Sequence, residues 1–201
     1  MAKRQHRGGR SRKYPIWVII VLLIVSIYSV VRNNDNKSNT GRDGYVEKNY
    51  KKAKKPFRSL KTFTGKVVGI SDGDTFDVLY EGYAERVRLA EIDCPEKKQA
   101  FGKAAKKYAS DLCFGKIVTV ASGGKRDRYG RVVGTVITKE GINVNEALIQ
   151  AGLAWHYKDY SDSDALAEME NKARVEKVGL WSAKNPVAPW QYRKNRRNRS
   201  R

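Results

Sequence analysis

The 201-residue sequence has few of the side chains that build metal clusters, with two cysteines and two histidines. It contains no Cys-x-x-Cys pair and no group of cysteines with histidines, so a structural zinc site is unsupported. His156 is the one histidine outside the N-terminal leader, and its place in GLAWHYKDY favours a packing or surface role. Cys94 and Cys113 leave two interpretations open. In an exported domain they suit a disulfide that closes a loop of about 20 residues and contributes about 3 kcal/mol, and they equally suit two packed thiols.

Acidic side chains are also scarce, at 21 Asp and Glu against 41 Lys and Arg, but the imbalance is not spread evenly. Residues 62–181 carry 18 basic and 18 acidic side chains, so this stretch is neutral. The flanks hold the other 23 basic and 3 acidic residues, which accounts for the net charge of +20. Basic tails are attracted to polyanions or membrane surfaces, and they are equally typical of solvated, disordered segments.

One long apolar run is present, YPIWVIIVLLIVSIYSVV at residues 14–31, and it carries no charge. As a helix it spans roughly 27 Å, just enough for a hydrocarbon core of about 30 Å. The basic leader, residues 1–13, would also suit a signal peptide, but no good small-x-small cleavage site follows Val31, so an uncleaved transmembrane anchor is favoured. The positive-inside rule then predicts a single-pass protein of the cell membrane with a cytoplasmic N-terminus. Everything after the anchor is expected in the periplasm or outside the cell.

The rest of the chain divides by composition. Residues 32–61 are polar and lysine-rich, which is typical of a linker, and residues 183–201 form a basic C-terminal tail. Between them, residues 62–182 are long enough for one domain with a single core, and they show no internal repeat.

The periodicity of this domain predicts an α+β, mainly β, fold. Short β-branched segments predict strands at residues 62–70, 75–80, 84–92, 116–122 and 131–138, with YEGY at 80–83 as a hairpin turn. Apolar spacing and capping residues predict three helices, which run from Gln99 to Gly115, from Asn143 to Gly152 and from Ser163 to Val178. Five strands with a helix after the third describe a five-stranded Greek-key barrel of the OB type, preceded by the one transmembrane helix.

Acidic residues gather in the turn SDGDTFDV, where Asp72 and Asp74 share one face of an extended backbone and Gly73 permits a tight bend. Taken alone, this is an ordinary Asp-Gly turn. A second acidic group, Asp93 and Glu96, follows the predicted third strand in VRLAEIDCPE. Two separated carboxylate sites with nearby arginines suit attack on a phosphodiester.

Each residue type fits one part of that chemistry. Asp74 and Asp93 can hold a hard divalent cation such as Ca²⁺, which prefers oxygen ligands and polarises a phosphate oxygen. Arg88 and Arg131 can neutralise charge on a pentacoordinate transition state. Glu96 can orient or deprotonate the attacking water.

The segments DGDT, RVRL, IDCPE, DRYGR, VNEAL, GLAW and GLW occur in one order from about Thr62 to Trp181. In that order they resemble the thermonuclease-like, or staphylococcal nuclease, family. The resemblance implies an OB-fold nuclease that uses Ca²⁺ and cleaves DNA and RNA to 3′-phosphate products. It matches Asp74 and Asp93 to carboxylate ligands of the ion and Cys94 to a residue whose backbone carbonyl binds it. It also matches the catalytic trio, which here is Arg88, Glu96 and Arg131.

Tyrosines complete the expected substrate site. Tyr129, within DRYGR, is expected beside bound nucleotide, where it can stack on a base. Tyr157 or Tyr160 can assist, although a core or surface role fits each of them at least as well. The expected partners are DNA, RNA and the membrane, and the protein is expected to be monomeric. The alternative function is a membrane-anchored OB module that binds nucleic acid without cutting it.

Overall fold

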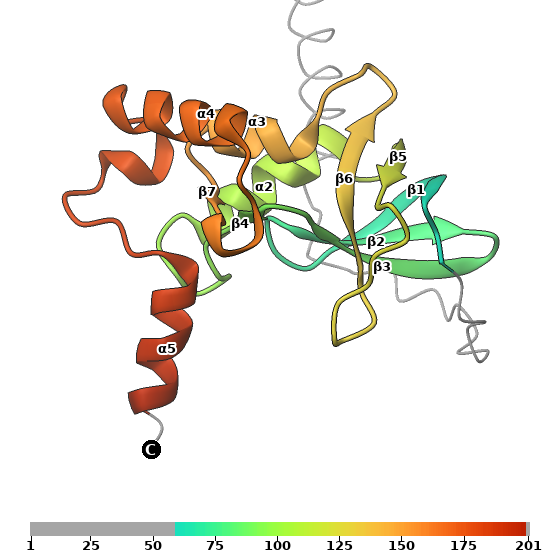
Figure 1. Cartoon of the computed structure of the whole chain (residues 1–201), viewed down its shortest axis with the longest axis horizontal. Coiled ribbons are helices and arrows are strands. Elements are labelled where there is room, and N and C mark those ends of the chain that lie inside the picture. The colour runs from blue at the N-terminus through green and yellow to red at the C-terminus, as the bar shows by residue number, and fades with distance from the viewer. Residues whose placement is uncertain (1–58, 200–201) are drawn as a thin grey trace, which may run out of the picture. The chain divides into compact units, whose positions relative to one another are not determined.

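The computed structural model describes residues 59–199, in which five strands close into a barrel (Figure 1). The order of hydrogen-bonded neighbours around the barrel is β1 (Thr62–Ile70), β2 (Thr75–Tyr80), β3 (Tyr83–Leu89), β6 (Val132–Thr138) and β5 (Ile117–Ala121). The pair of β3 and β6 is parallel, and the other neighbours are antiparallel. This arrangement confirms the predicted five-stranded barrel.

The barrel closes because one face of each strand is apolar. Alternate side chains of the strands point inward and are buried, among them Phe76, Val78, Val87, Val120 and Val136. The turn between β2 and β3 is the predicted hairpin, with Glu81 and Gly82 both at positive φ, 46° and 81°. Two positive φ angles give the hairpin a twist that matches the twist of its strands.

Helices lie at the side of the barrel (Figure 1). Three of them were predicted, and the structure bounds them as α2 (Gly102–Cys113), α3 (Val144–Gln150) and α4 (Asp164–Val175). Asn143 caps α3: its side chain accepts hydrogen bonds from the backbone N–H of Asn145 and Glu146. Leu166 and Ala173 of α4 are buried, as predicted.

The prediction of one strand over residues 84–92 is wrong, because the segment breaks at Glu91, which has a φ of 64°. Beyond the break, β4 (Ile92–Asp93) leaves the barrel and pairs with β7 (Trp155–His156). Two short 3₁₀ helices, Lys158–Tyr160 and Gly179–Ser182, flank α4. The small β4–β7 sheet brings Asp93 to the edge of the barrel.

A fourth helix, α5 (Pro189–Arg199), lies in the segment predicted only as a basic tail, so the prediction of three helices is incomplete. Proline suits the first turn of a helix, because backbone N–H groups there have no acceptor within the helix and the N–H that proline lacks is not needed. Trp190 then stacks on Tyr157, with the ring centroids 5.2 Å apart and the planes 4° from parallel. Helix α5 is therefore held by side chains from a distant part of the chain.

Both cysteines are free and buried, so the structure supports packed thiols and not a disulfide. Cys113 donates its thiol hydrogen to the carbonyl of Ala109 on α2. His156 is also buried, with Nε2 3.0 Å from Ser161 Oγ, which confirms a packing role for it.

The predicted leader, transmembrane anchor and nearly all of the linker lie outside the described residues. Within residues 59–199, no helix has the length and apolar character needed to cross a membrane. The last linker residue, Lys61, joins the barrel, since its carbonyl accepts a hydrogen bond of 2.8 Å from the backbone of Ser122.

Candidate active site

The turn between β1 and β2 is fixed against the segment that follows β4. Asp74 is buried, and its Oδ2 accepts a 2.6 Å hydrogen bond from the backbone N–H of Cys94. Gly73 permits this approach, because a Cβ there would lie 2.8 Å from both Cys94 Sγ and Ala105 Cβ. The glycine was expected to serve a tight bend. It is not among the residues at positive φ, so close packing is the reason for it.

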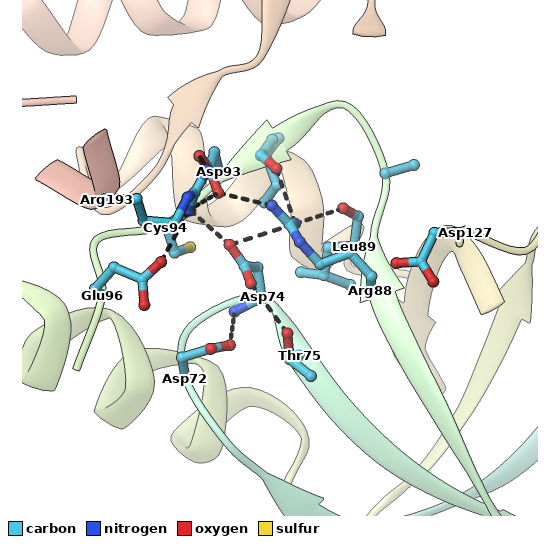
Figure 2. Close-up of polar contacts among 12 residues, drawn as sticks. Asp72, Asp74, Thr75, Arg88, Leu89, Asp93, Cys94, Glu96, Asp127 and Arg193 are labelled. Carbon is cyan, nitrogen blue, oxygen red and sulfur yellow. Dashed lines mark hydrogen bonds and ion pairs between the residues drawn. The ribbon is translucent and has the colours of Figure 1, made fainter. Parts of the chain in front are cut away.

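Arg88 of β3 joins the two carboxylates that the sequence assigns to a metal. Its Nη2 donates to Asp93 Oδ1 at 2.8 Å, and its Nη1 lies 3.3 Å from Asp74 Oδ2. Nη1 also donates to the carbonyls of Leu89 and Ile92, at 2.8 and 2.9 Å. The guanidinium is therefore locked in one orientation with its charge between two buried acids (Figure 2).

A second guanidinium reaches the same carboxylates from α5. Arg193 donates from Nη2 to Asp93 Oδ2 at 2.8 Å and from Nη1 to Asp93 Oδ1 at 3.3 Å. Its Nη1 also donates to Glu96 Oε1 at 2.9 Å, so Arg193 links Glu96 to Asp93 (Figure 2). We refer to Asp72, Asp74, Asp93 and Glu96 as the carboxylate cluster.

The cluster crowds negative charge into a buried place. Burial and then the charge of Asp74 raise the pKa of Asp72 to about 7. Burial also raises the pKa of Asp93, against the opposing effect of its hydrogen bonds from Arg193. Although burial lowers the pKa of Arg88, the charges of Asp74 and Asp93 raise it further, so this side chain stays protonated. The Cys94 thiol has its pKa raised well above the usual range, mainly by burial, so it is not an ionised ligand.

The third predicted catalytic residue, Arg131, lies in the loop between β5 and β6 and not in the cluster. Its Nε donates to Asp127 Oδ2 at 2.7 Å, and its backbone N–H donates to Asp127 Oδ1 at 2.9 Å. The register pairs Arg88 with Val133, two residues after Arg131, so Arg131 immediately precedes the part of β6 that lies beside Arg88. Among the described residues, no ion pair joins Arg131 to the cluster.

Tyr129 is in the same loop, with 69% of its surface exposed. Its hydroxyl accepts a 2.8 Å hydrogen bond from Arg128, and the Arg131 guanidinium lies 5.5 Å from the ring centroid. The loop thus presents an open aromatic ring beside two positive charges. Such a surface can stack a base and bind its phosphate.

The other predicted tyrosine, Tyr157, packs against α5. It follows β7, and one side of its ring is covered by Trp190. Tyr160 lies 4.7 Å from it and is 73% exposed. Burial and then the nearby charge of Asp93 raise the pKa of Tyr157. The structure therefore gives Tyr157 a packing role at the border of the site.

Sequence reasoning missed Arg193 and Asp127, for different reasons. Asp127 is in the same DRYGR motif as Arg131, four residues earlier, and a carboxylate at that spacing was a usable signal. Arg193 lies in a strongly basic segment, so its charge does not distinguish it from its neighbours. The pattern PW at Pro189 and Trp190 was the one signal that a structured element begins.

The donor set of the cluster fits a hard cation. Asp74 and Asp93 present carboxylate oxygens to the same guanidinium, that of Arg88, at 3.3 and 2.8 Å. Over residues 59–199, no three His, Cys, Asp or Glu side chains stand together in an arrangement that could hold a metal.

Comparison with known proteins gives a consistent set of relatives. The sequence model of the family described as "Staphylococcal nuclease homologue" matches residues 86–183. The chain is 45% identical over 129 residues to an "Uncharacterized endonuclease" of Escherichia coli, covering 64% of this chain and 84% of that protein. It is 42% identical over 146 residues to a "Micrococcal nuclease" of Shigella flexneri, covering 68% and 83%. A staphylococcal-like nuclease of Arabidopsis thaliana is 44% identical over 112 residues, which cover 56% of this chain and 34% of the plant protein.

Proposed function

Because the chain belongs to the staphylococcal nuclease family, we propose that it is a metal-dependent nuclease that hydrolyses DNA and RNA with little sequence specificity. The proposed products have 3′-phosphate ends, so the bond that breaks is between phosphorus and the 5′ oxygen. One observation carries the proposal: Arg88 is fixed between the buried carboxylates of Asp74 and Asp93. The Arg88 guanidinium, which can bind a phosphate, therefore contacts two carboxylates that can serve as hard oxygen ligands.

The path of the substrate follows from the barrel. OB folds bind oligonucleotides over strands 2 and 3 and with the loops that here join β1 to β2 and β5 to β6. The first of these loops carries Asp72 and Asp74, and the second carries Tyr129 and Arg131. A strand that stacks a base on Tyr129 would pass its phosphate toward Arg88 on the outer face of β3. Stacking and backbone contacts do not select a base sequence, which supports low specificity.

Asp74, Asp93 and the backbone carbonyl of Cys94 are the residues we assign to Ca²⁺. When bound there, the ion supplies polarisation of a phosphate oxygen. The chain itself supplies the positive charge of Arg88, whose orientation is already fixed by the carbonyls of Leu89 and Ile92. A preorganised donor costs no reorientation as the transition state forms.

The other two assigned residues complete the hydrolysis. Glu96 accepts a proton from the attacking water, whose oxygen bonds to phosphorus while the bond to the 5′ oxygen breaks. The 5′ oxygen leaves with the electron pair of that bond and takes a proton from solvent water to become a hydroxyl. Arg131 donates to an equatorial phosphate oxygen in place of one of its bonds to Asp127. Its place just before the part of β6 that pairs with Arg88 supports this role.

Cleavage assays with the full chain test the proposal. Linear single-stranded DNA, double-stranded DNA and RNA are incubated with Ca²⁺, with Mg²⁺ and with chelator, beside the Glu96→Ala variant. We expect cleavage that needs the ion and collapses in the variant. The products should prime a polymerase only after phosphatase treatment, which identifies 3′-phosphate ends. Tight binding without cleavage under every ion would instead establish the non-catalytic binding module.

We also propose that residues 14–31 anchor this domain, as a monomer, at the outer side of the cell membrane. Support comes from the uncharged apolar run and from the six basic residues among the first 13. In spheroplasts, added protease should degrade the nuclease domain and leave cytoplasmic markers intact. Protection of the domain from protease would contradict this orientation.

A further inference from the structure

Arg193 is a charged residue of the site that the roles assigned above do not use. It belongs to α5, and it makes three hydrogen bonds of 2.8 to 3.3 Å to Asp93 and Glu96. Asp93 is 1% exposed, and its side chain has two cationic partners, Arg88 and Arg193. Two residues that the reaction needs in fixed relation are thus joined by one guanidinium.

We infer that Arg193 is a positioning residue of the nuclease, which holds the carboxylate of Glu96 in a fixed relation to Asp93 and makes α5 part of the active site. The inference depends on the proposed function, because it assigns Glu96 the task of accepting a proton from water. Glu96 lies in a loop after β4, outside any helix or strand. A loop carboxylate has many rotamers, and a bond from a docked helix reduces them.

The hydrogen bonds of Arg193 leave acceptor sites unused on both carboxylates. Arg193 binds Oε1 of Glu96, and within the described part of the chain no hydrogen bond or ion pair is made to Oε2. Oδ2 of Asp93 accepts one bond, from Arg193, and a carboxylate oxygen has a second lone pair. Glu96 can therefore hold a water molecule, and Asp93 a cation, while Arg193 stays in place.

The segment that carries Arg193 is tied to Glu96 at a second point. Gln99 accepts a 3.2 Å hydrogen bond from the backbone N–H of Glu96, and its Nε2 donates to the carbonyl of Val187 at 2.6 Å. Val187 comes just before α5, and Trp190 in its first turn stacks on Tyr157. Both contacts lie on the N-terminal side of Arg193, so the start of α5 is fixed against the site, as a positioning role requires.

Arginine suits this place better than lysine. Its two terminal nitrogens lie in one plane and bond to both oxygens of Asp93 while one of them also reaches Glu96. A lysine has a single nitrogen and cannot reproduce that planar fork. The substitution Arg193→Lys therefore keeps the charge and removes the shared geometry.

The test uses the full chain with the substitutions Arg193→Ala, Arg193→Lys and Glu96→Ala. Arg197→Ala is the matched control, because Arg197 is exposed and lies one turn later on α5. The substitution removes the same charge from the same helix. Values of kcat and KM are measured on a short single-stranded oligonucleotide with Ca²⁺, with and without added guanidinium ion. Thermal unfolding is measured on each variant.

We expect Arg193→Ala to lower kcat about 10- to 100-fold with KM changed less than about twofold, as for other residues that orient a metal-site side chain. Arg193→Lys should recover a small part of the loss, guanidinium should raise kcat of Arg193→Ala only, and Arg197→Ala should match the parent.

If Glu96→Ala loses its activity while Arg193→Ala is as active as Arg197→Ala, the inference fails and the proposed function stands. Faster cleavage by Arg193→Ala would identify an inhibitory plug and also overturn it. A loss that guanidinium does not restore and that follows a fall in unfolding temperature would show a structural role. A parent chain that cleaves nothing would remove the proposed function and this inference together.

Discussion

Arg88 Nη2 lies 2.8 Å from Asp93 Oδ1, and the two side chains are 13% and 2% exposed. A charge pair of this kind is costly to break from one side, because the remaining partner stays buried without compensation. The contact therefore joins the stability of the β3–β4 segment to the proposed chemistry.

Arg88→Ala should lower the free energy of unfolding by about 3 kcal/mol, because it also removes the bonds to the carbonyls of Leu89 and Ile92. Arg86→Ala is the control on the same face of β3, where the side chain pairs with Asp77 and is 57% exposed. That change should cost less than about 1 kcal/mol. Urea unfolding in chelator measures both, and equal costs would show that Arg88 is not a structural charge.

The cluster should make stability depend on pH through Asp72. Its pKa is about 7 in the folded chain and 3.8 in a free side chain, so the folded state binds the proton more tightly. The stabilisation is complete below pH 3.8 and is lost as pH rises through about 7. In chelator, the free energy of unfolding should fall by about 2–3 kcal/mol from pH 5 to pH 8 on account of this group.

Asp72→Asn should flatten that dependence, and Asp162→Asn, at an exposed position before α4, should leave it unchanged. Chemical unfolding at a series of pH values gives the curves. A parent curve that rises from pH 5 to pH 8 would contradict the assigned direction of the shift. Asp93, whose pKa is also raised, leaves a smaller decline in the variant.

The barrel could be predicted from sequence because each strand has its own alternation of apolar and polar residues, and because the turn at Glu81 and Gly82 has local chemistry. Asp74, Arg88 and Asp93 could be named because carboxylates and arginine suit attack on a phosphodiester and because their motifs occur in the order of the staphylococcal nuclease family. The pairing of β4 with β7 could not be predicted from the sequence, since each strand has two residues, which are too few to show an alternation of apolar and polar side chains.

Helix α5 could not be predicted because its stability is not local. Its sequence is polar and strongly basic, and adjacent like charges oppose a helix in isolation. The contacts of Trp190 with Tyr157 and of Arg193 with Asp93 hold it. Those contacts exist only once the barrel has folded. The sequence could not show whether the two cysteines form a disulfide for the same reason, because pairing depends on where the fold places them.

Asp127 should prove essential for the placement of Arg131. It accepts hydrogen bonds from the backbone of Tyr129 and from the backbone and side chain of Arg131. Burial opposes its ionisation, but the hydrogen bonds from Arg131 lower its pKa overall, so it is charged at neutral pH. Asp127→Ala should lower kcat/KM about tenfold or more with little change in unfolding temperature.

Asp111→Ala is a suitable control for that measurement, since Asp111 forms an exposed ion pair with Lys107 on α2, outside the assigned site. It should leave kcat/KM within about twofold of the parent. If Asp127→Ala keeps full activity, the loop does not need Asp127 to present Arg131, and the proposed exchange between carboxylate and phosphate is wrong.

The thiols of Cys94 and Cys113 should be inert in the folded protein. Burial raises the pKa of Cys113 to about 12, and it raises that of Cys94 well above the usual range. Since the thiolate is the reactive form, a thiol with that pKa is almost fully protonated at pH 8. An aromatic disulfide reagent should therefore titrate no thiol of the native chain at pH 8 and two per chain in denaturant. Titration of two thiols per chain in denaturant without reductant would also exclude a disulfide between Cys94 and Cys113. Titration of no thiol under those conditions would show that the disulfide is present. Rapid reaction of one thiol in the native chain would show that its segment opens, and loosening beside Cys94 would release the turn at Asp74 that its backbone holds.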